Sequence, residues 1–170
     1  MAAEDARLNN GAGQNPDRFF GLDELRRRSR SQQVAAVCYR IGKDDVEFLL
    51  IRTRGGRWTF PKGSAEPGLT HAQAAALEAY EEGGVHGRME MASFTQYARR
   101  KRSSGVEIMV NVHLCEVLRL DRAPEAGRDP TWFSAEKAMK KLRDDRADDH
   151  GTQLAGVIEL ALRRIRSKRS

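Results

Sequence analysis

Residues 61–85 read PKGSAEPGLTHAQAAALEAYEEGGV, a loop rich in glycine and proline followed by an alanine-rich run with three glutamates. Thr70 and Gln73 have the spacing of a capping box, in which a hydroxyl and an amide side chain each satisfy a free backbone group at a helix start. Gly83 and Gly84 supply the left-handed residue that commonly ends a helix. The stretch therefore predicts a loop and a short helix between Thr70 and Gly84.

The three glutamates of this helix, Glu78, Glu81 and Glu82, lie at positions i, i+3 and i+4. On a helix this spacing places them on one face, with Cβ atoms about 5–6 Å apart and a repulsion of about 0.2–0.5 kcal/mol per pair. A divalent cation reverses the sign of that interaction, because Mg²⁺ prefers hard oxygen ligands and binds carboxylates together with substrate phosphates. A solvated acidic helix face is the alternative interpretation of the triplet alone.

Apolar runs on both sides of the glutamate helix predict strands. The expected strands are residues 34–41, 46–52, 57–60, 89–97 and 106–118. Residues 42–45 form a hairpin signal between the first two, and residues 99–105 form a basic turn between the last two. From Val106 to Leu114 apolar residues occupy every second position, so one face of that strand is expected in the core.

Two helices are expected near the end of the chain. Ser134 has the position of an N-cap for a helix over Ala135–Leu142. A last helix is indicated by its apolar stripe, which consists of Leu154, Val157, Ile158, Ala161 and Ile165. Strands interleaved with helices predict the α/β class, with helices on a mixed β-sheet.

The length of 170 residues suits one domain. Residues 1–31 are polar and basic and are expected to form a flexible arm, with the folded domain over 32–170. Cys38 and Cys115 fall inside expected strands, which indicates buried free thiols. The chain shows no secretory signal and no apolar run of about 20 residues, so a cytoplasmic protein without a membrane span is expected.

The net charge of +6 is typical of a protein that binds polyanions. Basic residues gather in four clusters, at residues 26–30, 52–57, 99–102 and 163–169. Nucleic acid is an alternative partner on charge alone. Aromatic residues make up only 6% of the chain, however, whereas proteins that bind single strands place aromatic side chains among the basic ones.

The spacing of Gly63, Glu78, Glu81, Glu82 and Gly84 resembles the Nudix box, the signature of the Nudix hydrolases, and Val85 fits its closing aliphatic position. The resemblance implies a Nudix-type α/β/α sandwich that cleaves diphosphates linked to a further group. Two positions depart from the pattern. Leu69 stands where the family usually has its first glutamate. Leu77 stands where it usually has an arginine that orients the helix glutamates.

The flanks of the box, from about residue 32 to 165, resemble the diphosphoinositol polyphosphate phosphohydrolase branch, which also takes diadenosine polyphosphates. The similarity lies in residues 34–40, 48–51 and 57–58, in the pair Gly127-Arg128, and in Trp132-Phe133. It implies hydrolysis of a phosphoanhydride in a polyphosphorylated small molecule, with Mg²⁺ as cofactor and Mn²⁺ as the alternative.

The resemblance also implies site residues. Glu78, Glu81 and Glu82 are expected to bind the metal, with Glu81 and Glu82 as the catalytic carboxylates. The Lys62 carbonyl and Gly63 would lie at the same metal. Phosphate contacts are expected from Arg54, Lys62, Arg100, Lys101, Arg102 and Arg128, because a guanidinium matches phosphate oxygens two at a time. The alternative general bases outside the helix are Glu66, Glu90, Glu107 and Glu116.

Two alternatives stay open at this point. Leu69 and Leu77 allow a Nudix-like module that binds without cleaving and serves as a sensor. ADP-ribose or the 5′ end of an RNA is an alternative substrate. The sequence gives no indication of the oligomeric state.

Overall fold

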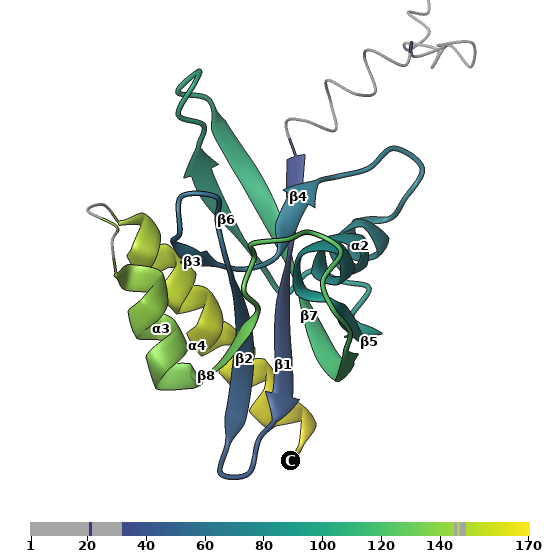
Figure 1. Ribbon diagram of the computed structural model, residues 1–170, viewed down its shortest axis with the longest axis vertical. Coiled ribbons are helices and arrows are strands. Elements are labelled where there is room, and N and C mark those ends of the chain that lie inside the picture. Colours follow the sequence, from purple (N-terminus) through teal and green to yellow (C-terminus); the bar gives the residue numbers. More distant parts are fainter. Residues whose placement is uncertain (1–20, 22–31, 145, 147–148) are drawn as a thin grey trace, which may run out of the picture.

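A computed structural model describes residues 21, 32–144, 146 and 149–170 of the chain. The expected N-terminal arm, residues 1–31, therefore lies outside the described residues except for Gly21. Within the described part, a twisted sheet runs through the middle of the molecule and helices lie on both sides of it (Figure 1).

The described strands are β1 (Gln32–Ile41), β2 (Val46–Arg52), β3 (Trp58–Thr59), β4 (Lys62–Ser64), β5 (Val85–Met89), β6 (Thr95–Arg100), β7 (Glu107–Leu120) and β8 (Thr131–Ser134). The helices are α2 (His71–Gly83), α3 (Ala135–Arg143) and α4 (His150–Lys168). The hairpin predicted from residues 42–45 joins β1 to β2 in antiparallel register.

The sheet is mixed. Its main path is β3-β2-β1-β7-β5, while β4 pairs with β1, β6 with β7 and β8 with β2. β1 and β7 run parallel, with Ala36 opposite His113, and all the other pairs are antiparallel. β7 pairs with β6 over its first half and with β5 over its second half.

β1 shows why the sheet is covered on both faces. Val34, Ala36 and Cys38 pack in a cluster with the alanines of α2. The residues between them, such as Val37, face a second and larger cluster that includes side chains of α3 and α4. Because successive side chains of a strand point to opposite faces, this run of buried residues requires helices on both sides. The predicted α/β/α sandwich with a mixed sheet is confirmed.

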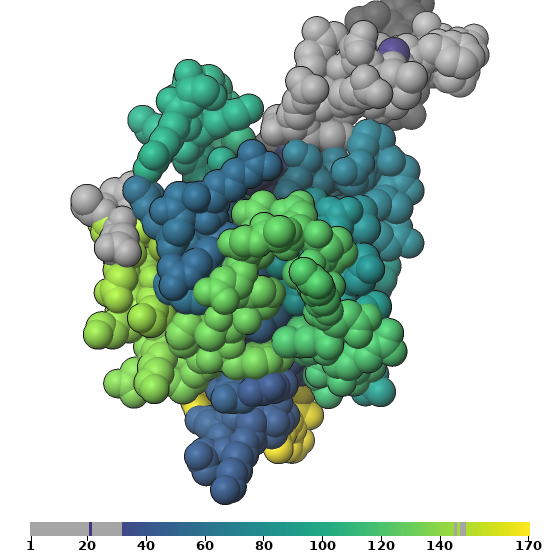
Figure 2. Space-filling view, in the orientation of Figure 1, coloured from purple at the N-terminus to yellow at the C-terminus, as the bar shows by residue number. Residues whose placement is uncertain are grey.

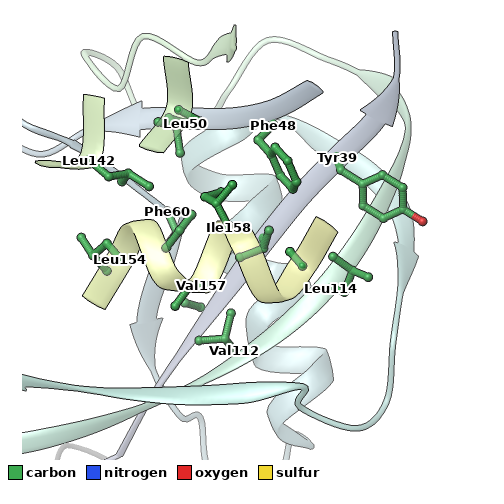
Figure 3. Close-up of a cluster of buried hydrophobic side chains, with 14 of the residues drawn as sticks. Tyr39, Phe48, Leu50, Phe60, Val112, Leu114, Leu142, Leu154, Val157 and Ile158 are labelled. Atoms are coloured by element: carbon green, nitrogen blue, oxygen red, sulfur yellow. The ribbon is translucent and has the colours of Figure 1, made fainter. Parts of the chain in front are cut away.

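The larger cluster is shown in Figure 3, where Leu154, Val157 and Ile158 of α4 point at Phe48, Phe60 and Val112 of the sheet side. The whole apolar stripe predicted for the last helix is buried. The N-cap Ser134 accepts a hydrogen bond from Lys137 N, as its position predicted. α3 and α4 are thus fixed by apolar side chains whose spacing the sequence already displays.

Two expectations about the strands were wrong. The expected strand over residues 89–97 is two strands, β5 and β6, joined by residues 90–94. In this connection the N–H of Glu90 bonds to Leu114 O and that of Phe94 bonds to Val112 O, so the chain follows β7 without a regular ladder. Val106 was expected in the core but is exposed, because it precedes the first residue of β7.

Cys38 and Cys115 are buried free thiols, as predicted, and lie opposite each other on the two parallel strands. None of the described helices is both long and apolar enough to cross a membrane.

Candidate active site

The glutamate helix α2 begins and ends where local signals placed it. Thr70 Oγ1 accepts from Gln73 N at 3.1 Å, and Gln73 Oε1 accepts from Thr70 N at 2.9 Å, which is the predicted capping box. At the other end Gly84 is left-handed with φ 67°, and a Cβ there would collide with the carbonyl of Asp121. These two ends fix the rotation of the helix and hence the direction of its glutamates.

Gly63 lies directly against Glu78. A Cβ at position 63 would overlap the carboxylate of Glu78, so a glycine is required for this close approach. β4 holds Gly63 in place, because it pairs with Val34 of the central strand β1. The loop and the helix of residues 61–85 therefore meet at one point, with a carboxylate between them.

Glu82 is the most buried of the three glutamates. Its Oε2 accepts from the backbone N–H of Lys62 at 3.3 Å, and its Oε1 lies 3.7 Å from Arg128 Nη2. Burial raises the pKa of Glu82, and this effect is opposed by the charge of Arg128 and the hydrogen bond from Lys62. Glu82 is thus a charged group out of water that depends on two partners.

Glu78 has no such cationic partner among the causes that shift its pKa. Burial, followed by the charges of Glu82 and Glu81, raises the pKa of Glu78 to about 8. The charges of Glu125 and Glu66 also raise the pKa of Glu78. Five acidic side chains therefore act on one small region, and a positive charge placed among them would relieve their repulsion.

The loop over residues 121–130 crosses this region and is tied to it at several points. Glu125 N donates to Glu81 O at 2.9 Å, and Arg128 Nε donates to Glu125 Oε2 at 2.8 Å. Arg52 N donates to Arg128 O at 2.6 Å, while Arg128 Nη1 donates back to Arg52 O at 3.3 Å. The loop thereby holds the Arg128 guanidinium over the end of α2.

A basic cleft of about 1240 Å³ opens beside Lys62. Its walls come from the turn after β2, from β6 and the basic turn, and from the start of α4. The basic residues that line it are Arg57, Lys62, Arg99, Arg100, Lys101, Arg102 and Arg146. The basic turn extends beyond the sheet in Figure 1 and stands out in the space-filling view of Figure 2.

Lys62 connects the cleft to the glutamates. Its ammonium donates to Thr59 Oγ1 at 3.2 Å, while its backbone N–H bonds to Glu82. Burial, and then the charge of Arg99, lower the pKa of Lys62 to about 8. An anion in the cleft would favour the charged form of this lysine.

The structure brings most of the predicted site residues together and shows what surrounds them. Glu82 is hydrogen-bonded to the backbone of Lys62, and the carboxylate of Glu78 lies against Gly63. Glu81 is half-buried on the same helix, and Arg100, Lys101 and Arg102 line the cleft. Arg54 is exposed in the turn between Thr53 and Gly55, both of which line the cleft.

Among the alternative bases, Glu66 is exposed in the loop before α2, Glu107 lines the cleft, and Glu90 is paired with Arg164 and Lys168 of α4. Two charged residues close to the site were not predicted. Glu125 acts on Glu78 and Glu82, and its position two residues before the Gly127-Arg128 pair was the available signal. Arg146 comes from the connection between α3 and α4, and nothing in the local sequence places it at the cleft.

The donor set fits a hard divalent cation in its chemistry, since carboxylate oxygens gather where repulsion and burial disfavour their charged forms. Within the described ranges, no three carboxylate, histidine or cysteine side chains already surround one point as metal ligands. Arg128 and the Lys62 amide engage the oxygen atoms of Glu82 instead. A cation at this site would therefore exchange with Arg128 as the counter-charge.

An α/β/α sandwich with a capped acidic helix beside a basic cleft defines the class of the protein, and comparison with known proteins agrees. The NUDIX domain model matches residues 31–154. The chain therefore belongs to the Nudix hydrolase family.

This chain is similar to several named proteins and to several solved structures. Human diphosphoinositol polyphosphate phosphohydrolase 3-beta is 31% identical over 115 residues, which cover 66% of this chain and 69% of the relative. Among solved structures, a NUDIX hydrolase from Nitrosomonas europaea has a TM-score of 0.59 at 25% identity, covering 76% of this chain and 86% of its own. An Ap4A hydrolase of C. elegans, solved as a binary complex, has a TM-score of 0.57 at 20% identity, covers 80% and 98% respectively, and supports the fold.

Proposed function

We propose that this chain is a Mg²⁺-dependent hydrolase of phosphoanhydride bonds in a highly phosphorylated small molecule, either a diphosphoinositol polyphosphate or a dinucleoside polyphosphate. Mn²⁺ is the alternative metal. The proposal also places the protein in the cytoplasm.

The observation that carries the proposal is the junction at Lys62. Its backbone binds Glu82 of the acidic helix, and its side chain lines the arginine-rich cleft. A ligand with several phosphates can therefore lie in the cleft with one phosphate next to the glutamates. The relative that is similar over two thirds of its length is named as a diphosphoinositol polyphosphate phosphohydrolase, which supports this substrate class.

Glu78 and Glu82, with Glu81 and the carbonyl oxygen of Lys62, are the groups that would hold the cation beside Gly63. The cation, when bound, supplies charge neutralisation at the bridging phosphates and lowers the pKa of a coordinated water. Arg128 would leave Glu82 and turn toward the negative charge of the substrate, because its pairing with Glu82 is long at 3.7 Å.

Side chains of the protein would bind the substrate phosphates and accept the proton of the attacking water. Arg100, Lys101 and Arg102 would bind the distal phosphates at the cleft, with Arg54 at its edge, and so keep the substrate in line with α2. Lys62 would neutralise charge on the phosphate closest to the glutamates. Glu81, which is half-buried on the same helix, would accept the proton of the attacking water as general base.

A phosphate-release assay tests the proposal on four substrates: an inositol pyrophosphate, diadenosine tetraphosphate, ADP-ribose and capped RNA. We expect Mg²⁺-dependent turnover of one of the first two, and a loss on the order of 10³-fold in Glu82→Gln, because the substitution removes a charged ligand. Glu159→Gln, an exposed glutamate of α4, is the matched control and should keep full activity. Turnover that survives in Glu82→Gln would contradict the metal assignment.

A second candidate is a module that binds the polyphosphate without cleaving it. The observation in its favour concerns Leu69 and Leu77, which replace a glutamate and an arginine of the family pattern. Both are exposed, and a leucine side chain supplies no charge to the glutamate site. Tight binding of an inositol pyrophosphate without turnover of any substrate in the same assay would select this candidate.

A further inference from the structure

A second hollow lies on the outer side of α2, away from the basic cleft. It is a groove of about 830 Å³ between α2, β5 and the end of β7. Its apolar walls include Leu69, Leu77, Tyr80 and Leu118, whose exposed fractions are 40%, 37%, 39% and 58%. Large side chains exposed together in this way are typical of a docking surface, whereas single ones are ordinary.

The groove contains both residues that depart from the Nudix pattern. Leu69 lies in the loop before α2, and Leu77 lies on the helix two turns later. The two leucines create an apolar surface, which costs solubility unless something covers it.

The chain itself supplies an apolar segment of suitable length. Residues 18–28 read RFFGLDELRRR, in which Phe19, Leu22 and Leu25 lie at i, i+3 and i+6, the spacing of one helix face. A groove of about 830 Å³ has the size of a pocket that takes a few inserted side chains. A second copy of the chain, as the alternative occupant, would have to bury about 800 Å² on each partner to form a stable dimer.

The point at which the segment joins the fold lies close to the groove. The carbonyl of Gln32, the first residue of β1, accepts from Ala65 N at 3.1 Å, and Ala65 is four residues from Leu69. Six residues lie between Leu25 and Gln32, and the seven steps from one to the other can span up to about 23–25 Å. The segment is therefore long enough to reach the Leu69 end of the groove.

Opposite charges on the segment and on the loop beside the groove also favour docking. Arg26, Arg27 and Arg28 follow the apolar residues of the segment, and Glu66 is exposed in the loop between Ala65 and Leu69. We propose that residues 18–28 dock in cis into the groove of Leu69, Leu77, Tyr80 and Leu118, so that the N-terminal segment covers the surface created by the two leucines.

Thiol labelling of the full chain tests the docking. Leu118→Cys places a reporter in the groove, and the native Cys38 and Cys115 are buried and give a slow background. If the segment is docked most of the time, a maleimide should label this cysteine about fivefold faster once Phe19→Ser, Leu22→Ser and Leu25→Ser are added, since the rate follows the open fraction. Ile41→Cys, exposed at the far end of β1, should label at one rate in both backgrounds.

A second measurement separates this proposal from a second copy of the chain as the occupant. The pair Leu22→Cys and Leu118→Cys should form a disulfide within one chain under oxidised glutathione, seen as a cross-linked peptide in a monomeric band. Equal labelling rates with and without the serine substitutions would overturn the proposal. So would protection of Leu118→Cys that disappears on dilution, or a disulfide found only between chains.

Discussion

Arg128 lies between two glutamates of different origin: its Nε binds Glu125 of its own loop at 2.8 Å, and its Nη2 lies 3.7 Å from Glu82 of α2. The short bond fixes the loop, and the long one leaves Glu82 accessible to another cation. This arrangement makes Arg128 the counter-charge of the site in the absence of metal, and it determines what removal of the arginine should do.

Arg128→Gln should lower the free energy of unfolding in the absence of metal by about 1–3 kcal/mol, because it leaves the buried Glu82 without its cationic partner. Mg²⁺ should then stabilise the variant more than it stabilises the wild type, since no arginine competes for Glu82. Thermal denaturation with Mg²⁺ and with EDTA measures both effects. Arg119→Gln, an exposed arginine outside the loop, is the control, and an unchanged Mg²⁺ increment in Arg128→Gln would count against the exchange.

Gly63→Ala should reduce turnover and leave the fold intact. The added Cβ overlaps the carboxylate of Glu78, which lies at the free end of a side chain and can move away at little cost to the fold. The displaced carboxylate should reduce turnover on the order of 10²-fold, as misplacement of a catalytic group by about 1 Å commonly does. Gly156→Ala meets no atom within 4 Å and should leave the rate unchanged. Equal rates for the two variants would show that the Gly63–Glu78 contact is not needed.

The stability of the metal-free protein should decrease as the pH rises from about 4.5 to about 8. Burial and the neighbouring glutamates raise the pKa of Glu78 to about 8 from 4.5, so in this window the folded chain holds a proton that the unfolded chain has lost. The contribution is complete below pH 4.5 and is lost as the pH passes 8. Urea denaturation in EDTA at several pH values measures this effect. The free energy of unfolding should fall less steeply with pH in Glu78→Gln than in the wild type.

Mg²⁺ binding should release a proton below pH 8, because the metal requires the ionised carboxylate of Glu78. Calorimetry in two buffers of different ionisation enthalpy measures that proton. The release should decline above pH 8 and be smaller in Glu78→Gln. Binding heats that are independent of the buffer at pH 7 would place the metal away from Glu78.

The triple variant Arg100→Ala, Lys101→Ala and Arg102→Ala should raise the KM for a polyphosphate substrate by tenfold or more, and should weaken its dependence on salt, because phosphate contacts made by charged groups contribute about 1.5–3 kcal/mol each. A matched control is Arg163→Ala, Arg166→Ala and Arg169→Ala, which removes the same charge near the C-terminal end of α4 (Figure 1). If both variants change KM equally, the net charge and not the cleft binds the substrate.

The features that the sequence predicts well are those that depend on neighbours along the chain. Thr70 and Gln73 cap α2, and Gly84 ends it, because each acts within a few residues of its target.

Other features depend on distant partners and could not be predicted. The break between β5 and β6 at residues 90–94 arises because these strands pair with different halves of β7. Arg146 reaches the cleft because its guanidinium donates to the carbonyls of Leu142 and Trp58, the second of which is far away in sequence. Glu125 is brought to the site by the pairing of Arg52 with Arg128. Charge and hydrophobic spacing contain no information about such long-range pairs.

The parallel pairing of β1 with β7 also determines the order in which the protein can fold. Ala36 pairs with His113 only after the 76 intervening residues have been made, and these include the glycine-rich loop and the glutamate helix of residues 61–85. Closing such a long loop is entropically costly and slows folding. During synthesis, the residues of α2 leave the ribosome before those of β7, so over that interval the apolar side of α2 has no complete sheet to pack against.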